Sequence, residues 1–229
     1  MVGELLTMLF LLPKNFRAGV SCMVLSCLLA NGVFATPAAL NSEAAIMTAT
    51  ADLDAKNYEA ALLAIAPALE AHPGDPEIIN LKGAILTKQK NYDAARLCFA
   101  QALQLSPGFF PARYNIGALL ALQHQWDAAI NYYRNLLIDQ PDNELVEYKL
   151  LLLLLHQDAD PELQKKLFAT DLPTNTPAWY FATAARCYKN GRVEEAEKYL
   201  EVAGNIYGHK TAIFQEELDE SGLNALKKQ

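Results

Sequence analysis

Hydrophobic residues along most of the chain recur at the spacing of amphipathic helices, and these helices follow one another in pairs. The first helix is predicted over residues 43–55, where the apolar positions fall on one face. Those positions are Ala45, Ala49 and Leu53. A second helix is predicted over residues 58–71. Each pair leaves an apolar face that only a neighbouring pair can cover, so the pattern predicts an all-α stack of helix pairs.

Six consecutive leucines, residues 150–155, stand out in the helix predicted over residues 144–157. The run is far too short to cross a bilayer, and Lys149 and His156 bracket it. A helix that is apolar all round is typically buried in a protein core. We therefore expect this helix to be buried between its neighbours.

A period of 34 residues relates successive helix pairs. Gly83 and Gly117 stand 34 residues apart, and four further pairs of residues share this spacing: Tyr92 and Trp126, Ala95 and Ala129, Phe99 and Tyr133, and Pro107 and Pro141. We expect the glycines to let two helices approach closely and the aromatic residues to fill the space between pairs. The prolines stop the helices, because proline cannot continue one.

This pattern resembles the tetratricopeptide repeat (TPR) family, which has a small residue at position 8, aromatic residues at 17 and 24, alanine at 20 and proline near 32. The resemblance implies an all-α, right-handed superhelical TPR solenoid of about five helix-turn-helix repeats with a C-terminal capping helix. After a linker over 36–41, the solenoid spans 42–220. Its parts are repeats 42–75, 76–109, 110–143, a degenerate 144–176 and 177–210, then the cap 211–220 and a tail 221–229.

Residues 1–35 have the layout of a secretory signal. Lys14 and Arg17 precede an uncharged apolar run over residues 18–30, and small residues lead up to Ala35. This layout predicts an exported protein in a periplasmic or other extracytoplasmic compartment.

The sequence is consistent with three ways of processing the N-terminal segment. Cleavage after Ala35 is the favoured one. The others are an uncleaved anchor over residues 18–35 and lipid modification of Cys27. Association with a membrane is expected only through this segment, if it is retained or lipidated.

The charge balance excludes some classes of partner. The full chain carries 19 basic and 26 acidic residues, a net charge of −7. Without the leader, which holds Lys14, Arg17 and Glu4, 17 basic and 25 acidic residues remain, a net charge of −8. Nucleic acids and anionic membrane surfaces need clustered basic residues, so we expect no nucleic-acid partner.

No pattern in the sequence predicts catalysis. The four histidines are scattered, and there is no metalloprotease, nucleophile-elbow or phosphate-loop motif. An acidic cluster at Asp158, Asp160 and Glu162 lacks the features of a calcium loop, and we interpret it as helix capping and solvated charge. We expect no enzymatic activity, no metal and no cofactor.

The TPR resemblance implies binding of a protein or peptide on the concave face, which is lined by the first helix of each repeat. Aromatic walls over small residues suit an extended or helical apolar segment. In the other interpretation, these rings only pack on one another or on the capping helix. The candidate groove residues are Asn80, Tyr114, Asn115, Ala118, Tyr148, Lys149, Leu152, Phe181, Ala185 and Tyr188.

The function predicted is therefore that of an exported TPR scaffold or adaptor in cell-envelope assembly or secretion. The alternative is a carrier that holds an apolar small molecule or lipid in the same groove. A carrier would retain a small ligand on purification, whereas a scaffold would retain a protein.

Overall fold

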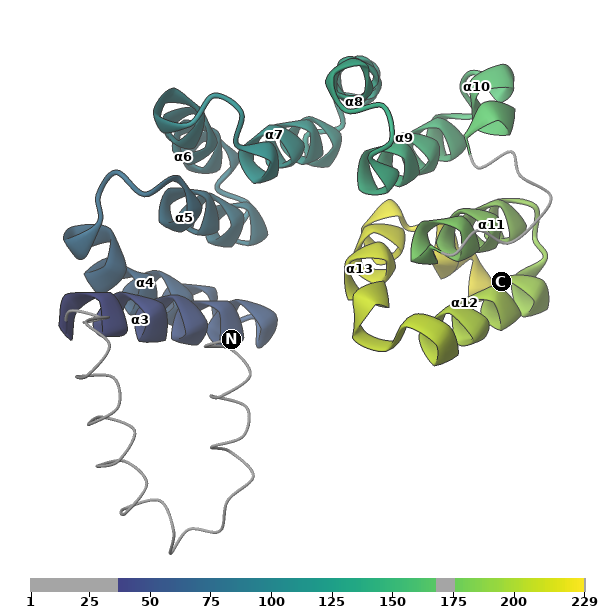
Figure 1. The fold of residues 1–229 in the computed structure, drawn as a ribbon. Helices are drawn as coiled ribbons and strands as arrows, with labels where there is room; N and C mark the ends of the chain where they lie inside the picture. The colour runs from purple at the N-terminus through teal and green to yellow at the C-terminus, as the bar shows by residue number, and fades with distance from the viewer. Residues whose placement is uncertain (1–36, 168–175, 229) are drawn as a thin grey trace, which may run out of the picture. The chain divides into compact units, whose positions relative to one another are not determined.

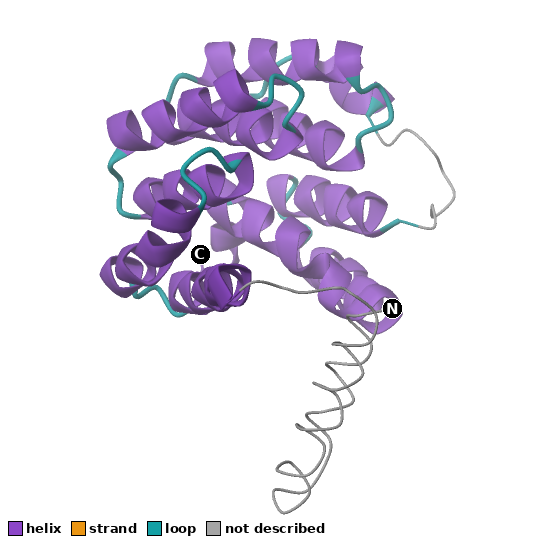
Figure 2. Ribbon diagram, turned by 60° about the vertical axis from the view of Figure 1, so that its left-hand side comes forward, coloured by secondary structure: helices purple, strands orange, loops and turns teal. Residues whose placement is uncertain are grey.

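The computed structural model describes residues 37–167 and 176–228. Within those ranges the chain is helical and contains no strand (Figures 1 and 2). The all-α repeat fold predicted from the sequence is confirmed. The predicted signal segment, residues 1–35, lies outside the described residues.

The chain divides into two compact units, of which the first ends at Pro73. Its described part is one helix pair, α3 (Pro37–Asp54) and α4 (Tyr58–Ala71). The two helices contact each other, and their fully buried residues are small or branched: Ala49, Ala61, Ile65 and Ala68. This pair corresponds to the first predicted repeat.

Helix α3 begins earlier than expected. The linker predicted over residues 36–41 is helical from Pro37 onwards, whereas we expected the helix to start at Glu43. Proline is well tolerated in the first turn of a helix, because its missing N–H is not needed there. The following residues, Ala38, Ala39 and Leu40, are strong helix formers, which explains the extension.

The second unit, residues 74–229, contains four more helix pairs and a C-terminal segment. The pairs are α5 (Pro76–Lys88) with α6 (Tyr92–Leu105), α7 (Phe110–Leu122) with α8 (Trp126–Asp139), α9 (Glu144–Gln157) with α10 (Pro161–Lys166), and α11 (Pro177–Lys189) with α12 (Val193–Tyr207). The short 3-10 helix η2 (Gly208–Thr211) then leads into α13 (Ala212–Ser221) and η3 (Leu223–Lys228).

The two repeat glycines are sites of close helix approach, as predicted. A Cβ atom added at Gly83 would lie 2.5 Å from the ring of Phe99, and one added at Gly117 would lie 2.6 Å from the ring of Tyr133. Both rings are buried, so neither can move aside freely. Glycine is therefore required where the first helix crosses the second in repeats 2 and 3.

Replacing Gly117 by alanine should lower the free energy of unfolding by about 1–3 kcal/mol, because the added methyl group overpacks the contact with Tyr133. Urea unfolding followed by circular dichroism measures this. The matched control is Gly108→Ala, where no atom lies within 4 Å of the added Cβ and the stability should hardly change. Equal effects at the two positions would contradict the close-packing interpretation.

The leucine-rich helix α9 is buried, as predicted. All six leucines over residues 150–155 are at most 5% exposed. Helix α10 is short, and the side chain of Asp160 caps its start by accepting a hydrogen bond from the N–H of Leu163 at 3.0 Å. The degenerate repeat thus keeps a full first helix and only a short second one.

The predicted tail contains a short helix. Most of its residues form η3, and Leu223 is buried. Gly222, with φ at +72°, ends α13 in the left-handed conformation that glycine adopts readily. The buried leucine anchors this segment, because it joins the apolar core of the second unit.

Candidate functional site

The first helices of the four pairs in the second unit, α5, α7, α9 and α11, share a surface against which α13 lies. We call this surface the inner face. Figure 1 shows α13 beside α9 and α11, and side-chain bonds reach from α13 to α5 and α7 as well. The inner face is therefore occupied by a helix of the same chain.

An aromatic cluster holds the N-terminal half of α13. The ring of Phe214 lies 5.6 Å from that of Tyr148 on α9 and 5.8 Å from that of Phe181 on α11. Phe214 is only 7% exposed, and Leu218, one turn later, is fully buried. Aromatic pairs at these separations contribute beyond simple burial, so this cluster anchors the helix.

A buried polar contact lies beside the aromatic cluster. Glu217 accepts a hydrogen bond from the hydroxyl of Tyr114 at 2.7 Å through one oxygen, and it forms an ion pair with Lys149 through the other. The side chains of Lys149 and Glu217 are 7% and 9% exposed. A buried charge is tolerated only when it is paired and hydrogen-bonded, and each of these charges satisfies the other.

A second set of ion pairs lies at the edge of α13. Lys88, the last residue of α5, contacts Glu216 at 2.6 Å and Glu220 at 2.7 Å. Burial alone would lower the pKa of Lys88, but the hydrogen bonds to both carboxylates raise it above its ordinary value. Lys88 thus remains charged and attracts the acidic edge of α13.

The structure buries most of the candidate groove residues beneath α13 or within the core. Those that are at most 7% exposed are Tyr114, Tyr148, Lys149, Leu152, Phe181, Ala185 and Tyr188. Of these, Tyr114, Tyr148, Lys149 and Phe181 contact α13 directly. The hydroxyl of Tyr188 instead bonds Glu197 on α12, away from α13. Three of the candidate groove rings, Tyr114, Tyr148 and Phe181, thus contact the capping helix, as in the second interpretation of the sequence.

Three candidate residues remain partly exposed, on the first helices of repeats 2 and 3: Asn80, Asn115 and Ala118. The amide of Asn115 donates a hydrogen bond to the side-chain oxygen of Asn80 at 3.0 Å. This is the part of the candidate groove that a partner can reach while α13 is in place.

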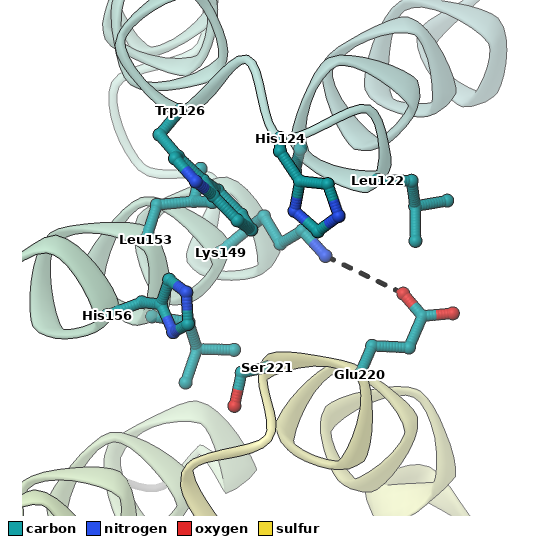
Figure 3. Close-up of a pocket in the computed structure, with 10 residues that line it drawn as sticks. Leu122, His124, Trp126, Lys149, Leu153, His156, Glu220 and Ser221 are labelled. Carbon is teal, nitrogen blue, oxygen red and sulfur yellow. Dashed lines mark ion pairs between the residues drawn. The ribbon is translucent and has the colours of Figure 1, made fainter.

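A cavity of about 290 Å³ adjoins the C-terminal end of α13 (Figure 3). Apolar residues of α7 and α9 form much of its wall, and Lys149 points towards Glu220 across it, with 3.8 Å between the charged atoms. The ring of Trp126 lies 5.2 Å from that of His124 and 4.7 Å from that of His156. Trp126, expected as a core filler, is thus half-buried at a cavity.

The two inner-face tyrosines form a matched pair for testing the polar contact. Tyr114→Phe removes a hydrogen bond to a buried carboxylate and should cost about 1.5–3 kcal/mol of stability. The hydroxyl of Tyr148 is buried and finds no partner in the described part of the chain, so Tyr148→Phe should be neutral or slightly stabilising. Thermal melts of both variants check this, and equal losses would contradict the assigned bond.

Alkaline pH should destabilise the second unit. Burial raises the pKa values of Tyr114, Tyr133 and Tyr148 well above the ordinary value near 10, and the carboxylate of Glu217 raises them further. Above pH 10 the unfolded chain therefore binds fewer protons than the folded chain, so stability that is complete below about pH 10 is lost as pH rises towards the folded pKa values. Urea midpoints at pH 8, 10 and 11 should fall in that order. A flat profile would contradict the burial of these hydroxyls.

The acidic cluster of the degenerate repeat is ion-paired. Asp158 contacts Lys189 at 2.8 Å, Asp160 contacts Arg134 at 2.6 Å, and Glu162 contacts Lys165 at 3.0 Å. Across residues 37–167 and 176–228, no three His, Cys, Asp or Glu side chains gather as a metal site would require. None of the helices in these ranges has the length and apolar character needed to span a bilayer.

Sequence reasoning missed the residues that α13 contributes to this site. The helical spacing of the cap predicts that Ile213, Phe214 and Leu218 face inward and that the acidic residues Glu216, Glu217 and Glu220 face water. The structure buries Phe214 and Leu218 as predicted, but it leaves Ile213 45% exposed and buries Glu217. Lys88 was not considered. The position of Lys149 could have indicated an acidic partner on another helix. A lysine on the inner side of a buried helix is almost never left unpaired.

Comparisons with known proteins agree on the repeat and the fold. Two family models described as tetratricopeptide repeat match residues 46–108 and 86–155. A search of curated proteins gave no significant match.

Three solved structures are similar to this chain. A mutant O-GlcNAc transferase of Thermobaculum terrenum is 24% identical with a TM-score of 0.51, over 59% of this chain and 26% of its own. Pseudomonas aeruginosa pilF is 18% identical with a TM-score of 0.55, over 83% of this chain and 90% of its own. A tetratricopeptide repeat protein of Parabacteroides merdae is 17% identical with a TM-score of 0.50, over 81% of this chain and 74% of its own.

At these identities the structural likeness shows the fold alone, and this chain spans only about a quarter of the transferase. The 34-residue period, the stacked helix pairs and the two matching family models agree with one another. Residues 46–155 of the chain therefore belong to the tetratricopeptide repeat family.

Proposed function

We propose that this chain is an exported scaffold of the cell envelope that binds a helical segment of a partner protein on its inner face. The general part of this function follows from the family, because tetratricopeptide repeats bind proteins or peptides and act as interaction scaffolds. Binding of a helical segment is supported by one observation: the inner face already holds a helix, α13.

The contacts on α13 are those of a helix-in-groove interaction. An aromatic side chain, Phe214, lies between two rings of the inner face, and an apolar residue follows one turn later at Leu218. Anchors at this spacing are how an amphipathic helix binds in an apolar groove. The inner face therefore has the shape and chemistry to hold a helix.

Photo-crosslinking in the native host tests partner binding at this surface. A benzoyl-phenylalanine placed at Asn115, which is partly exposed on α7, should crosslink one dominant protein through a helical segment. The matched control places the same group at Leu97, which is 72% exposed on the second helix α6. Equal capture of that protein from both positions would contradict binding at the inner face.

Export is proposed from the sequence of residues 1–35, with its basic start, uncharged run and small residues before Ala35. N-terminal sequencing of the protein from its host should find Thr36 as the first residue. An intact Met1 or Met8 would favour an uncleaved anchor, and a lipid on Cys27 would favour lipid modification. A protein found entirely in the cytosol would contradict export.

The alternative function is that of a carrier for an apolar small molecule. The cavity beside α13 supports it, because apolar residues such as Leu122, Leu152 and Leu153 form much of its wall. Its volume of about 290 Å³ is near the lower end for ligand pockets. Native mass spectrometry of the protein purified from its host distinguishes the two functions. A scaffold should show the mass of the chain alone or with a protein, and a carrier should retain a small molecule.

A further inference from the structure

We propose that α13 is an internal ligand of the inner face, and that the partner is an acidic amphipathic helix that replaces it with the same contacts. This inference rests on the proposed function and adds the chemistry of the partner. The partner helix carries an aromatic residue, a carboxylate three positions later and an apolar residue four positions later. Further carboxylates lie two and six positions after the aromatic residue.

The apolar half of this recognition pattern is set by Phe214 and Leu218. Phe214 contacts the rings of Tyr148 and Phe181, which come from two different repeats, and Leu218 is fully buried one turn later. An aromatic residue at another position of the helix would miss this cluster. The inner face therefore determines the register of any helix that binds there.

The polar half is set by Glu217. Its carboxylate satisfies Tyr114 and Lys149 together, and all three side chains are buried. A helix lacking a carboxylate at this position would leave the ammonium of Lys149 buried without a counter-charge, which is strongly unfavourable. The inner face thus selects acidic helices and rejects apolar ones.

Lys88 extends the same selection to the edge of the helix. It contacts Glu216 and Glu220, which lie one helical turn apart on α13. In a chain with a net charge of −7, Lys88 and Lys149 place two positive charges on the inner face. This local charge is complementary to an acidic helix.

Two features indicate that α13 is a replaceable occupant. A permanent cap does not need a buried ion pair, because well-packed apolar residues often stabilise a fold at least as well. In addition, the buried hydroxyl of Tyr148, whose ring contacts Phe214, has no hydrogen-bond partner within the described ranges. A partner helix that offers an acceptor to this hydroxyl gains a bond that α13 does not make.

A charge-swap experiment on the full-length chain tests the inference. The probe is a fluorescently labelled peptide of residues 208–224, in its natural sequence or with Glu216→Lys and Glu220→Lys. Lys88→Glu turns the attraction between Lys88 and the chain's own α13 into repulsion. Lys88 lies at the edge of the contact, with its side chain 34% exposed, so the fold should survive.

The Lys88→Glu chain should bind the charge-swapped peptide at least about tenfold more tightly than the natural peptide in fluorescence anisotropy. It should also bind the swapped peptide at least about tenfold more tightly than the wild-type chain does, because the new carboxylate attracts the peptide lysines and α13 competes less well for the site. Replacing Phe214 by alanine within the swapped peptide should abolish binding. Replacing Ile213, which is 45% exposed, should not.

Lys82→Glu is the matched control, since it makes the same charge change on α5 and no ion pair links Lys82 to α13 in the residues described. This variant should behave as the wild-type chain. Binding that ignores the charge swap, or no binding of either peptide to any folded variant, would overturn the inference. If the photo-crosslink at Asn115 still captures a partner in that case, the proposed function stands and only the internal-ligand inference fails.

Discussion

Replacing Lys149 by methionine should lower the free energy of unfolding by about 3–5 kcal/mol, because it leaves the carboxylate of Glu217 buried without its cation. Both side chains of this ion pair are less than 10% exposed, so water cannot take the place of the missing charge. Urea unfolding of the full chain, followed by circular dichroism, measures the loss.

A double-mutant cycle measures the interaction energy between Lys149 and Glu217 separately from their other contacts. In a Tyr114→Phe background, where no buried hydroxyl loses its acceptor, combining Lys149→Met with Glu217→Leu should recover most of the loss. The reason is that an apolar pair can replace a buried ion pair without leaving a charge unpaired. The exposed pair of Lys165 and Glu162, with side chains 74% and 84% exposed, is the control. Lys165→Met should change stability by less than about 1 kcal/mol. Additive losses in the cycle would contradict a direct contact between Lys149 and Glu217.

Replacing Tyr148 by alanine should destabilise the second unit by about 3–5 kcal/mol, as deletions of large core side chains do. Its ring is fully buried and contacts Phe181 and Phe214 at 6.3 and 5.6 Å between centroids. Of the two interpretations of the sequence, the open groove predicts the opposite, since a ring on an open groove could be removed with little effect on the fold. Thermal unfolding and urea midpoints measure the change.

The control for Tyr148→Ala is Leu97→Ala. Leu97 is 72% exposed on α6, so its truncation should stay within about 0.5 kcal/mol of the parent. If Tyr148→Ala were as mild as this control, the ring would be accessible and α13 would not cover it.

The repeat architecture could be predicted because it depends on short-range patterns. The spacing of Gly83 and Gly117 from their aromatic neighbours defines each helix pair, and the structure places the ring of Phe99 or Tyr133 directly over each glycine. The burial of the leucine-rich helix followed from the same kind of argument, because a helix without a polar face must be covered on all sides.

The sequence left open whether α13 covers the groove, because the contacts that hold this helix are distant in sequence. The hydrogen bond between Tyr114 and Glu217 joins residues 103 positions apart. The apolar pattern of Phe214 and Leu218 showed that the helix has one buried side but not which surface it covers. Glu217 was assigned to solvent because a glutamate normally lies there, and only its pairing with Lys149 explains its burial.

Zero-length crosslinking with a carbodiimide tests most directly whether α13 lies on the inner face. This reagent joins an amine to a carboxylate that it contacts, and Lys88 lies within 2.7 Å of both Glu216 and Glu220. Peptide mapping of the native monomer should therefore find Lys88 linked to Glu216 or Glu220 within one chain, and the link should be lost on denaturation before treatment. A native monomer in which Lys88 is joined to neither residue would contradict the occupied inner face.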